Sequence, residues 1–405
     1  MLTYNEAIKL LLQDLSPLTA VEVSLYEALG QVLAEPVHSR WDLPTADNSA
    51  MDGYAFSFKG QRAGDDLTVA GFIPAGAPFA GKMVDGQAIK IMTGGVLPPE
   101  CDTVVPIEEV VESGASIRLS ESPAERQHVR RRGEEIGKGE TLLAPGTAIH
   151  AGEMGLLAAA GAERVRVHPR LRVALLSTGD ELVELGTAPG PGQIVNSNFH
   201  MLSARLREEG CTVIPLGIAR DNETVTAERI REGLKADLLI TTGGVSVGDR
   251  DYVQDALRAH GFELGFWRVA IKPGKPVLFG TAQGTPVLGL PGNPAASAAT
   301  FELFVRPALR RLAGHRDALA PRMRVTLTAA VTGDSKRQSF LWGSLREEAG
   351  AYLFTPSSWQ GSGQTRSIQA ATALLPVPAA SEGFPAGSEV EVLLLRLPPG
   401  ISDPA

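Results

Sequence analysis

The sequence predicts a multidomain protein built around a doubly wound α/β unit, with β-rich units before and after it. Between residues 169 and 317, apolar strand-like runs alternate with helix-like runs, the pattern of a parallel sheet covered on both faces. Residues 46–139 are rich in glycine, proline and short β-type runs, which is typical of a small β domain. From residue 321 on, apolar and polar residues alternate again, so we expect a C-terminal domain resembling a β-barrel.

The N-terminal elements follow from capping signals. Thr3 and Glu6 form a capping box ahead of apolar residues at helical spacing, and Ser24 and Glu27 repeat this device before a second, short helix. The segment 140–168 returns to helical texture, so we expect it to pack with the N-terminal helices in a mixed, discontinuous domain. The expected domains are 1–45 with 140–168, 46–139, 169–317 and 318–405.

Strands and helices are expected to alternate through the central unit. Strands are predicted at 173–176, 213–216, 237–240, 266–271, 277–279 and 287–290. Helices are expected between and after them, one with Phe199, Leu202 and Leu206 on one face, and others at 222–234, 251–260 and 294–312. In such a sheet, ligands bind in the crevice beyond the carboxyl ends of the strands.

Composition excludes several classes of protein. With 405 residues the chain is too long for one ordinary core, and 43% hydrophobic residues are a globular value. The formal net charge of −8, with no basic stripe, argues against a nucleic-acid partner. The N-terminus has no secretory signal, and no apolar run is long enough to span a membrane. Two cysteines without a CxxC pair fit a reducing compartment, so we expect a cytoplasmic protein.

Loops that interrupt the central unit carry glycine, acid or lysine. They are Ser177–Glu181, Gly243–Gly248, Lys272–Pro276 and Pro291–Pro294. Because loops at the carboxyl ends of strands share one crevice, their chemistry predicts one anionic ligand held over one sheet edge.

Glu181, Asp221 and Asp251 each stand where a strand gives way to a helix. Any one of them alone is more simply a capping residue that interacts with free helical N–H groups. Carboxylates gathered at one edge repel each other unless a cation joins them, and hard oxygen ligands suit Mg²⁺. Jointly the three acids therefore favour a metal and phosphate site.

The glycine-rich run Gly243–Gly248 follows a strand and precedes a helix, so its backbone is suited to a close approach to phosphate. A tight turn is the simpler alternative. A second alternative is a serine-hydrolase elbow, because Gly244, Ser246 and Gly248 fit the pattern G-x-S-x-G. Neither His260 nor His315 is well placed as the base, which favours the phosphate loop.

Lys272 and Lys275 bracket a Pro-Gly turn, and two ammonium groups held close together favour an oxyanion between them. In the β domain, Asp52 and Thr93 lie in short polar segments beside glycine. The run 130–135 is, on its chemistry alone, a solvated charge run.

Seven of these segments occur in the order seen in the molybdopterin molybdenumtransferase family, the bacterial MoeA type related to the E domain of gephyrin. They are 47–55, 92–94, 130–135, 177–181, 243–252, 272–276 and 290–294. The resemblance covers essentially the whole chain.

This resemblance implies the last step of molybdenum cofactor synthesis. Family members use Mg²⁺ to cleave adenylylated molybdopterin, insert molybdenum from molybdate and release AMP. The resemblance also implies an elongated homodimer of four-domain subunits, whose site lies between the α/β domain of one subunit and the small β domain of the other. A molybdopterin-adenylylating enzyme and molybdoenzyme acceptors are the expected partners.

The resemblance assigns roles residue by residue. Glu181, Asp221 and Asp251 match the acidic Mg²⁺ residues, Lys272 and Lys275 the molybdate-side cations, and Asp52, Thr93 and Glu135 the contributors from the partner domain. The residues implied to bind the pterin adenylate or the oxyanion are Thr178, Gly179, Asp180, Gly243, Gly244, Ser246, Gly248, Pro291, Gly292, Asn293, Pro294, Arg337 and Ser362.

Two departures from the family pattern stand out. Glu135 replaces the usual Asp, and Ala295 and Ala296 replace a Val-Ser pair, so a hydroxyl contact to molybdate is either lost or shifted to Ser297. Related α/β domains also occur in molybdopterin-adenylylating enzymes and in hydrolases of nucleotide pyrophosphates, and some relatives act as scaffolds. These alternatives would leave the β-domain segments or the lysine loop without a role.

Overall fold

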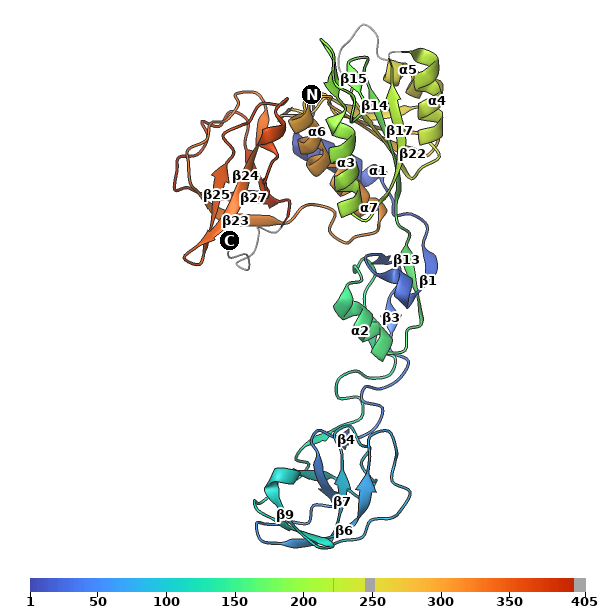
Figure 1. The fold of residues 1–405 in the computed structure, drawn as a ribbon, viewed down its shortest axis with the longest axis vertical. Coiled ribbons are helices and arrows are strands. Elements are labelled where there is room, and N and C mark those ends of the chain that lie inside the picture. Colours follow the sequence, from blue (N-terminus) through green and yellow to red (C-terminus); the bar gives the residue numbers. More distant parts are fainter. Residues whose placement is uncertain (221, 245–251, 397–405) are drawn as a thin grey trace.

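The computed structural model describes residues 1–220, 222–244 and 252–396, and these form an elongated molecule (Figure 1). The central α/β unit lies at one end beside the C-terminal β unit, and the unit containing β4–β9 lies at the opposite end. No helix among the residues that the structure describes has the length and apolar character needed to cross a membrane.

The central sheet has the strand order β17-β14-β18-β22-β21-β19. The first four are mutually parallel, as predicted, and they are β17 (Thr212–Ala219), β14 (Arg172–Thr178), β18 (Leu238–Thr242) and β22 (Thr285–Leu290). The residues of β14, β18 and β22 are largely buried, which explains their near-continuous apolar runs, whereas the edge strand β17 is only partly buried.

The prediction of an all-parallel sheet is wrong at one edge. Strands β21 (Leu278–Ala282) and β19 (Glu263–Trp267) run antiparallel to their neighbours. A tight hairpin joins β21 to β22 through Gln283 and Gly284, which both have positive φ. Such a turn reverses the chain within two residues, whereas a parallel connection needs a crossover of a dozen or more.

The predicted strand 266–271 is also divided. Its end forms β20 (Ile271–Lys272), which leaves the central sheet and pairs in parallel with β24 (Gln338–Glu348) of the C-terminal unit. Apolar periodicity does not reveal which sheet a short strand joins.

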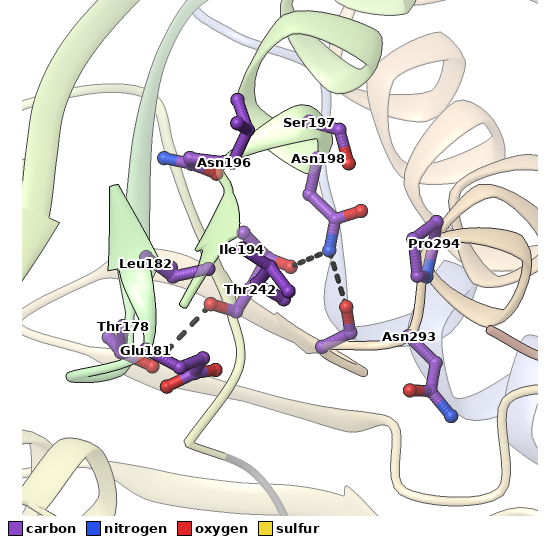
Figure 2. A pocket seen from close by; sticks show the side chains of 12 residues that line it. Thr178, Glu181, Leu182, Ile194, Asn196, Ser197, Asn198, Thr242, Asn293 and Pro294 are labelled. Carbon is purple, nitrogen blue, oxygen red and sulfur yellow. Dashed lines mark hydrogen bonds between the residues drawn. The ribbon is translucent and has the colours of Figure 1, made fainter. Parts of the chain in front are cut away.

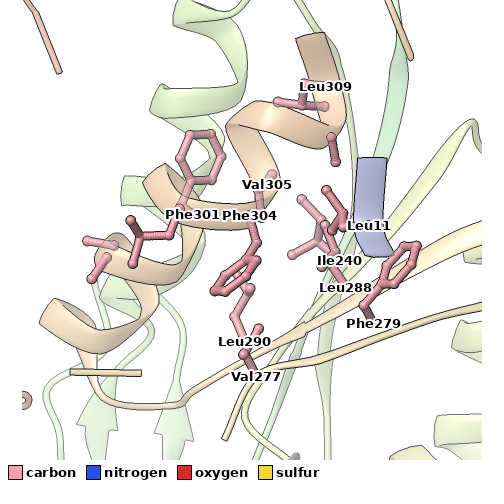
Figure 3. Close-up of a cluster of buried hydrophobic side chains, with 14 of the residues drawn as sticks. Leu11, Ile240, Val277, Phe279, Leu288, Leu290, Phe301, Phe304, Val305 and Leu309 are labelled. Carbon is pink, nitrogen blue, oxygen red and sulfur yellow. The ribbon is translucent and has the colours of Figure 1, made fainter. Parts of the chain in front are cut away.

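Helices cover both faces of the sheet, as expected for a doubly wound fold. On one face lie α4 (Glu223–Gly233) and α5 (Tyr252–Ala259). On the other lie α3 (Ser197–Glu208) and a continuous run made of α6 (Pro294–Thr300), the π-helical turn η3 (Phe301–Val305) and α7 (Arg306–Leu312). Figure 3 shows Phe301, Phe304 and Leu309 of this run packed over the sheet residues Ile240 and Leu288.

Helix α1 (Tyr4–Asp14) packs on the same core. Its predicted capping box is present, with Glu6 N–H donating to the Thr3 hydroxyl and Thr3 N–H to the Glu6 carboxylate. The Tyr4 ring meets Phe304 and Phe340 edge-on at centroid distances of 5.8 and 5.2 Å. The first helix thus contributes to the core shared by the central and C-terminal units.

The next segments pair with chain that follows much later. Strand β13 (Arg164–His168) lies between β1 (Val21–Ser24) and β2 (Val32–Leu33), and β12 (Thr141–Leu143) pairs with β3 (Val37–His38). The short helices η1 (Leu25–Ala28) and α2 (Ala151–Ala159) complete this unit. The predicted packing of 140–168 against the N-terminal segments is therefore seen in the strand pairing.

The unit formed within residues 46–139 is β-rich. Its six-stranded sheet has the order β8-β5-β7-β6-β10-β9. These strands are β5 (Gly53–Phe56), β6 (Asp66–Ile73), β7 (Gln87–Ile91), β8 (Thr103–Pro106), β9 (Val110–Ser113) and β10 (Ser116–Leu119), with η2 (Ile107–Glu109) before β9. A separate ladder pairs β4 (Asn48–Ser49) with β11 (Val129–Arg130).

The C-terminal unit is a closed barrel. Strand β24 pairs with both β25 (Ala351–Pro356) and β26 (Ala373–Val377), which closes a ring completed by β23 (Arg322–Leu327) and β27 (Glu389–Leu394). The turn η4 (Thr365–Ser367) lies between β25 and β26. Closure leaves the five strands without a free edge, as predicted for a barrel-like domain.

Candidate functional site

The carboxyl edge of the central sheet opens into a cavity of about 170 Å³. Figure 2 shows that its walls come from the loops after β14, β18 and β22 and from the start of α3. Its lining residues are Thr178, Glu181, Leu182, Ile194, Val195, Asn196, Ser197, Asn198, Thr242, Gly292, Asn293 and Pro294. Two of the four predicted loops, Ser177–Glu181 and Pro291–Pro294, therefore line one crevice, and Thr242 directly precedes the third.

The backbone brings these loops close together. The Thr178 hydroxyl donates to the carbonyl of Thr242 at 3.4 Å, and Gly243 N–H donates to the carbonyl of Leu290 at 3.1 Å. Gly243 has φ +87, and a Cβ there would lie 2.5 Å from the Thr178 carbonyl oxygen. A larger residue would thus push two of the loops apart, so glycine is required for this approach.

Asn198 was not predicted from the sequence, yet it joins two of these loops. Its Nδ2 donates to the carbonyl of Gly292 at 2.7 Å and to the Thr242 hydroxyl at 3.0 Å. The neighbouring Asn196 caps α3 by accepting from Phe199 N–H. A polar Asn-Ser-Asn run before an amphipathic helix predicts only a helix cap. Nothing in the sequence therefore distinguishes Asn196, which caps the helix, from Asn198, which joins two loops.

The exposed Glu181 lines the cavity and directly precedes β15 (Leu182–Val183), which pairs with β16 (Ile194–Val195). Its backbone carbonyl accepts from Ile194 N–H at 2.8 Å. A Cβ at Gly179 would lie 2.3 Å from the Glu181 carboxylate, so glycine leaves the room that this side chain occupies. The exposed Asp180 belongs to the same loop, and its carbonyl accepts from Arg220.

The predicted partners of Glu181 lie outside the described residues. These are Asp221 and Asp251, together with Ser246 and Gly248 of the glycine loop. Among the residues that the structure describes, no three His, Cys, Asp or Glu side chains form a metal-binding group. The three-acid ligand set therefore stays a prediction.

The lysine loop, Lys272–Pro276, contributes no residue to this cavity, so the prediction that all four loops share one crevice is wrong for this loop. It follows β20 of the barrel and precedes β21, whose antiparallel direction brings its first residue, Leu278, opposite Gly289 near the carboxyl end of β22. A Cβ at Gly274 would lie 2.5 Å from Thr300 Cγ2, so the loop packs on α6. Lys275 is exposed in this loop.

Lys272 lines a second cavity of about 320 Å³ between this loop and the barrel. The other lining residues are Pro273, Ala330, Val331, Thr332, Gly333, Ser339, Phe340, Leu341, Pro356, Ser357 and Gln360. The Lys272 ammonium lies 3.3 Å from Asp334, and the same carboxylate oxygen lies 3.3 Å from the guanidinium of Arg337. Two cations that the family resemblance assigned to an oxyanion thus meet at one acid.

One segment of the barrel, residues 357–362, reaches both cavities: Ser357 and Gln360 line the second, and Ser362 bonds to Asn293 of the first. Asn293 of the first cavity donates to the Ser362 hydroxyl at 3.1 Å. The Ser362 carbonyl accepts from the N–H groups of Ala295 and Ala296 at the start of α6. Pro291 and Ser297 are buried, and the Ser297 hydroxyl has no solvent-accessible surface, so Ser297 does not present a hydroxyl to the first cavity.

Asp52, Thr93 and Glu135 lie far from both cavities within one chain. One Asp52 carboxylate oxygen accepts from both the N–H and the hydroxyl of Thr93 at 2.6 Å, and the Thr93 hydroxyl is the main cause that lowers the pKa of Asp52. Glu135 lines a cavity of about 540 Å³ with Arg130, Asn48 and nearby residues. Figure 1 places this β-rich unit at the opposite end of the molecule.

The two histidines considered as the base of a serine hydrolase, and the two cysteines, do not line the first cavity. His260 lies beside Gln283, and His315 lies in a separate cavity where burial lowers its pKa. Burial raises the pKa of Cys101 and of Cys211 to about 12, so both thiols stay protonated at neutral pH.

Comparisons with known proteins cover nearly the whole chain. Residues 2–161 match the MoeA N-terminal region (domains I and II), residues 174–311 a probable molybdopterin binding domain, and residues 324–395 the MoeA C-terminal region (domain IV). A molybdopterin molybdenumtransferase from Nostoc sp. is 38% identical over 387 residues, which are 93% of this chain and 88% of the relative. That of Haemophilus influenzae is 39% identical over 319 residues, covering 78% and 79%.

A solved structure agrees with these matches. The molybdopterin biosynthesis MoeA protein from Pyrococcus horikoshii OT3 superimposes with a TM-score of 0.84 at 30% identity, over 97% of this chain and 100% of that one. The resemblance drawn from the sequence motifs is therefore confirmed. The chain belongs to the molybdopterin molybdenumtransferase family and is a transferase of molybdenum cofactor biosynthesis.

Proposed function

We propose that the protein inserts molybdenum from molybdate into adenylylated molybdopterin, with Mg²⁺-dependent cleavage of the adenylate and release of AMP. The observation that carries this proposal is the barrel segment 357–362, which reaches both cavities. Asn293 belongs to the glycine-rich edge suited to phosphate and touches Ser362. The same barrel segment contributes Ser357 and Gln360 to the cavity that holds Lys272. A phosphate site beside a cationic site is what the reaction needs.

The residues of the first cavity are suited to the adenylate and to Mg²⁺. Gly243, Gly244 and Gly292 allow phosphate oxygens to approach the backbone closely. Glu181, with the hydroxyls of Thr178 and Thr242 nearby, offers hard oxygen donors of the kind Mg²⁺ prefers. Glu181 would hold the ion together with Asp221 and Asp251. When bound, Mg²⁺ offsets charge that develops as the phosphoanhydride is cleaved.

Lys272 in the second cavity, with Lys275 and Arg337 outside its lining, is suited to the oxyanion. Lys272, Lys275 and Arg337 supply positive charge, and Arg337 offers a fork of N–H donors to oxygen atoms. Both cysteines are buried away from these cavities. The ligands that molybdenum acquires are therefore the dithiolene sulfurs of the pterin, which suit that metal as soft donors.

One assay tests the proposal. Purified protein is incubated with adenylylated molybdopterin, molybdate and Mg²⁺, and both AMP and protein-bound molybdenum are measured. We expect the two products to appear in about equal amounts, since each cleavage accompanies one insertion. AMP release that is indifferent to molybdate would instead indicate a pyrophosphate hydrolase. Formation of the adenylate from ATP would indicate an adenylylating enzyme, and peptide binding without turnover a scaffold.

We further propose a cytoplasmic homodimer in which Asp52, Thr93 and Glu135 act on the partner's α/β unit. Their distance from both cavities within one chain supports this arrangement. The supplier of the substrate would be a molybdopterin-adenylylating enzyme, and molybdoenzymes would accept the product.

Mixing two inactive variants should restore activity if the site is shared between subunits. An Asp52→Ala chain and an Asp251→Ala chain, unfolded together and refolded in equal amounts, give heterodimers with one intact and one doubly altered site. Since about half of the dimers are mixed, we expect about one quarter of wild-type AMP release. Each variant refolded alone is the control. Activity no higher than that of these controls would contradict the shared site.

A further inference from the structure

Asp334 occupies the point where the cations of the second cavity meet. Its Oδ2 lies 3.3 Å from Lys272 Nζ and 3.3 Å from Arg337 Nη2. The side chain of Asp334 is 15% exposed, against 53% for Lys272 and 32% for Arg337. The carboxylate is thus the inner member of the group, and the cations face outward around it.

The fold holds this carboxylate firmly in place. Its Oδ1 accepts from the backbone N–H groups of Lys336 and Arg337 at 3.0 and 3.1 Å, which leaves Oδ2 for the cations. The Asp334 carbonyl accepts from Ala380 N–H at 2.9 Å. A Cβ at Gly333 would lie 2.2 Å from the Ser381 carbonyl oxygen, so the loop packs tightly against residues 380–381.

The position of Lys272 is also built into the fold. Lys272 lies opposite Ser339 in the parallel pairing of β20 with β24. Arg337 lies three positions after Asp334, and the hydrogen bonds from the backbone of Lys336 and Arg337 to Asp334 set their spacing. An acid and two cations from different units are therefore brought together by backbone pairing, before any ligand is bound.

We propose that Asp334 is the internal counter-ion of the oxyanion site, which the incoming dianion must displace from Lys272 and Arg337. This inference rests on the proposed function. A carboxylate and a tetrahedral oxyanion offer the same kind of oxygen acceptor to a guanidinium and an ammonium group. The Asp334 carboxylate therefore offsets the repulsion between the two neighbouring cations. A ligand displaces it only by interacting with Lys272 and Arg337 more strongly than the carboxylate does.

The charge state of Asp334 agrees with this role. Backbone N–H donation from Lys336, with the Lys272 ammonium and the Arg337 guanidinium nearby, lowers its pKa to about 2. The carboxylate is therefore ionised throughout the physiological pH range and competes with the ligand at every such pH. A singly charged carboxylate is outcompeted most readily by a doubly charged anion, since Coulomb attraction scales with charge.

The test is molybdate binding, measured by calorimetry on the full-length protein, wild type and Asp334→Asn. Asparagine keeps the oxygen that accepts from Lys336 and Arg337 but removes the negative charge. We expect molybdate to bind the variant about tenfold more tightly, because two partly exposed ion pairs no longer have to be broken. In the AMP-release assay, the KM for molybdate should fall by a similar factor while kcat stays within about twofold of wild type.

Control variants separate this role from simpler ones. Glu382→Gln removes one exposed charge from the neighbouring loop and should leave the Kd within about twofold, since no ion pair is lost. Asp334→Ser also keeps a side-chain oxygen for the backbone, and it replaces the asparagine variant if that one fails to fold. Unchanged or weaker binding by the variant, alongside normal AMP release by wild type, overturns the inference alone. Absence of molybdate binding by wild type overturns the proposed function, and the inference with it.

Discussion

Glu181→Ala is expected to lower the rate of AMP release from bound adenylylated molybdopterin by about 100-fold, the usual loss when a charge-stabilising group is removed from an active site. Glu181 lies on the rim of the first cavity, where its carboxylate would hold Mg²⁺ against the adenylate phosphate. The concentration of Mg²⁺ that gives half-maximal rate should rise, while the affinity for the pterin adenylate changes little. Single-turnover AMP release over a range of Mg²⁺ concentrations measures both quantities.

The matched control is Glu184→Ala. Glu181 precedes the short strand β15, and Glu184 follows it. Glu184 is exposed, but it does not line the cavity. Wild-type rates are expected for this variant. If both substitutions slow AMP release equally, the effect comes from the general loss of negative charge and Glu181 has no special part in catalysis.

Arg306→Ala is expected to destabilise the protein by about 3–5 kcal/mol, the cost of breaking a buried ion pair, because Glu302 then keeps only Arg205 at 3.3 Å. Arg306 lies 2.6 Å from Glu302 and 2.8 Å from Glu209, and the side chains of Arg306 and Glu302 are 7% and 2% exposed. It also donates to the carbonyl of Leu395 at 3.2 Å, which ties the helical run to the end of the last barrel strand. Urea unfolding followed by circular dichroism measures the change in free energy of unfolding.

The stability lost in the Arg306→Ala variant should also depend on pH. Burial is the main cause that raises the pKa of Glu302, and Arg306 opposes it. Without Arg306 this pKa rises further, so the folded variant binds a proton that the unfolded chain releases. Stability then falls as pH increases above the pKa of the unfolded chain, and the penalty is smaller at low pH.

Arg310→Ala is the matched control for this prediction. Arg310 lies one turn later on α7 and donates to the carbonyl of Leu319. We expect a loss below about 1 kcal/mol, without the dependence on pH that Glu302 causes. A similar loss in both variants would mean that lost side-chain packing, and not the broken ion pair of a buried acid, explains the result.

Local sequence patterns predicted the elements that depend on neighbouring residues. The capping box of Thr3 and Glu6, the buried parallel strands β14 and β18, and the long helical run from residue 294 all appear in the structure. These features arise from side-chain periodicity and from hydrogen bonds between residues three or four apart. They are therefore visible in any short stretch of the chain.

The predicted loops meet in one cavity only where they follow parallel strands. Thr178, Glu181 and Gly292 line one cavity, because parallel strands of one sheet end at one edge. Asn198 was missed because an asparagine at the start of a helix predicts a cap, and its contact with Gly292 joins residues 94 positions apart. The strand after the lysine loop, β21, was expected to be parallel to its neighbours but is antiparallel to β22. The periodicity of an apolar strand is the same in both directions, so it does not reveal a reversal by a two-residue hairpin.

The amino-acid sequence by itself determined the family and the order of its matched regions along the chain. Only the tertiary structure decided that Lys272 leaves the central sheet to pair with the barrel, and that it meets Arg337 on the carboxylate of Asp334. The physical reason is that periodicity reports which face of an element is buried, whereas the partner of a strand or a charge is fixed by packing between distant segments.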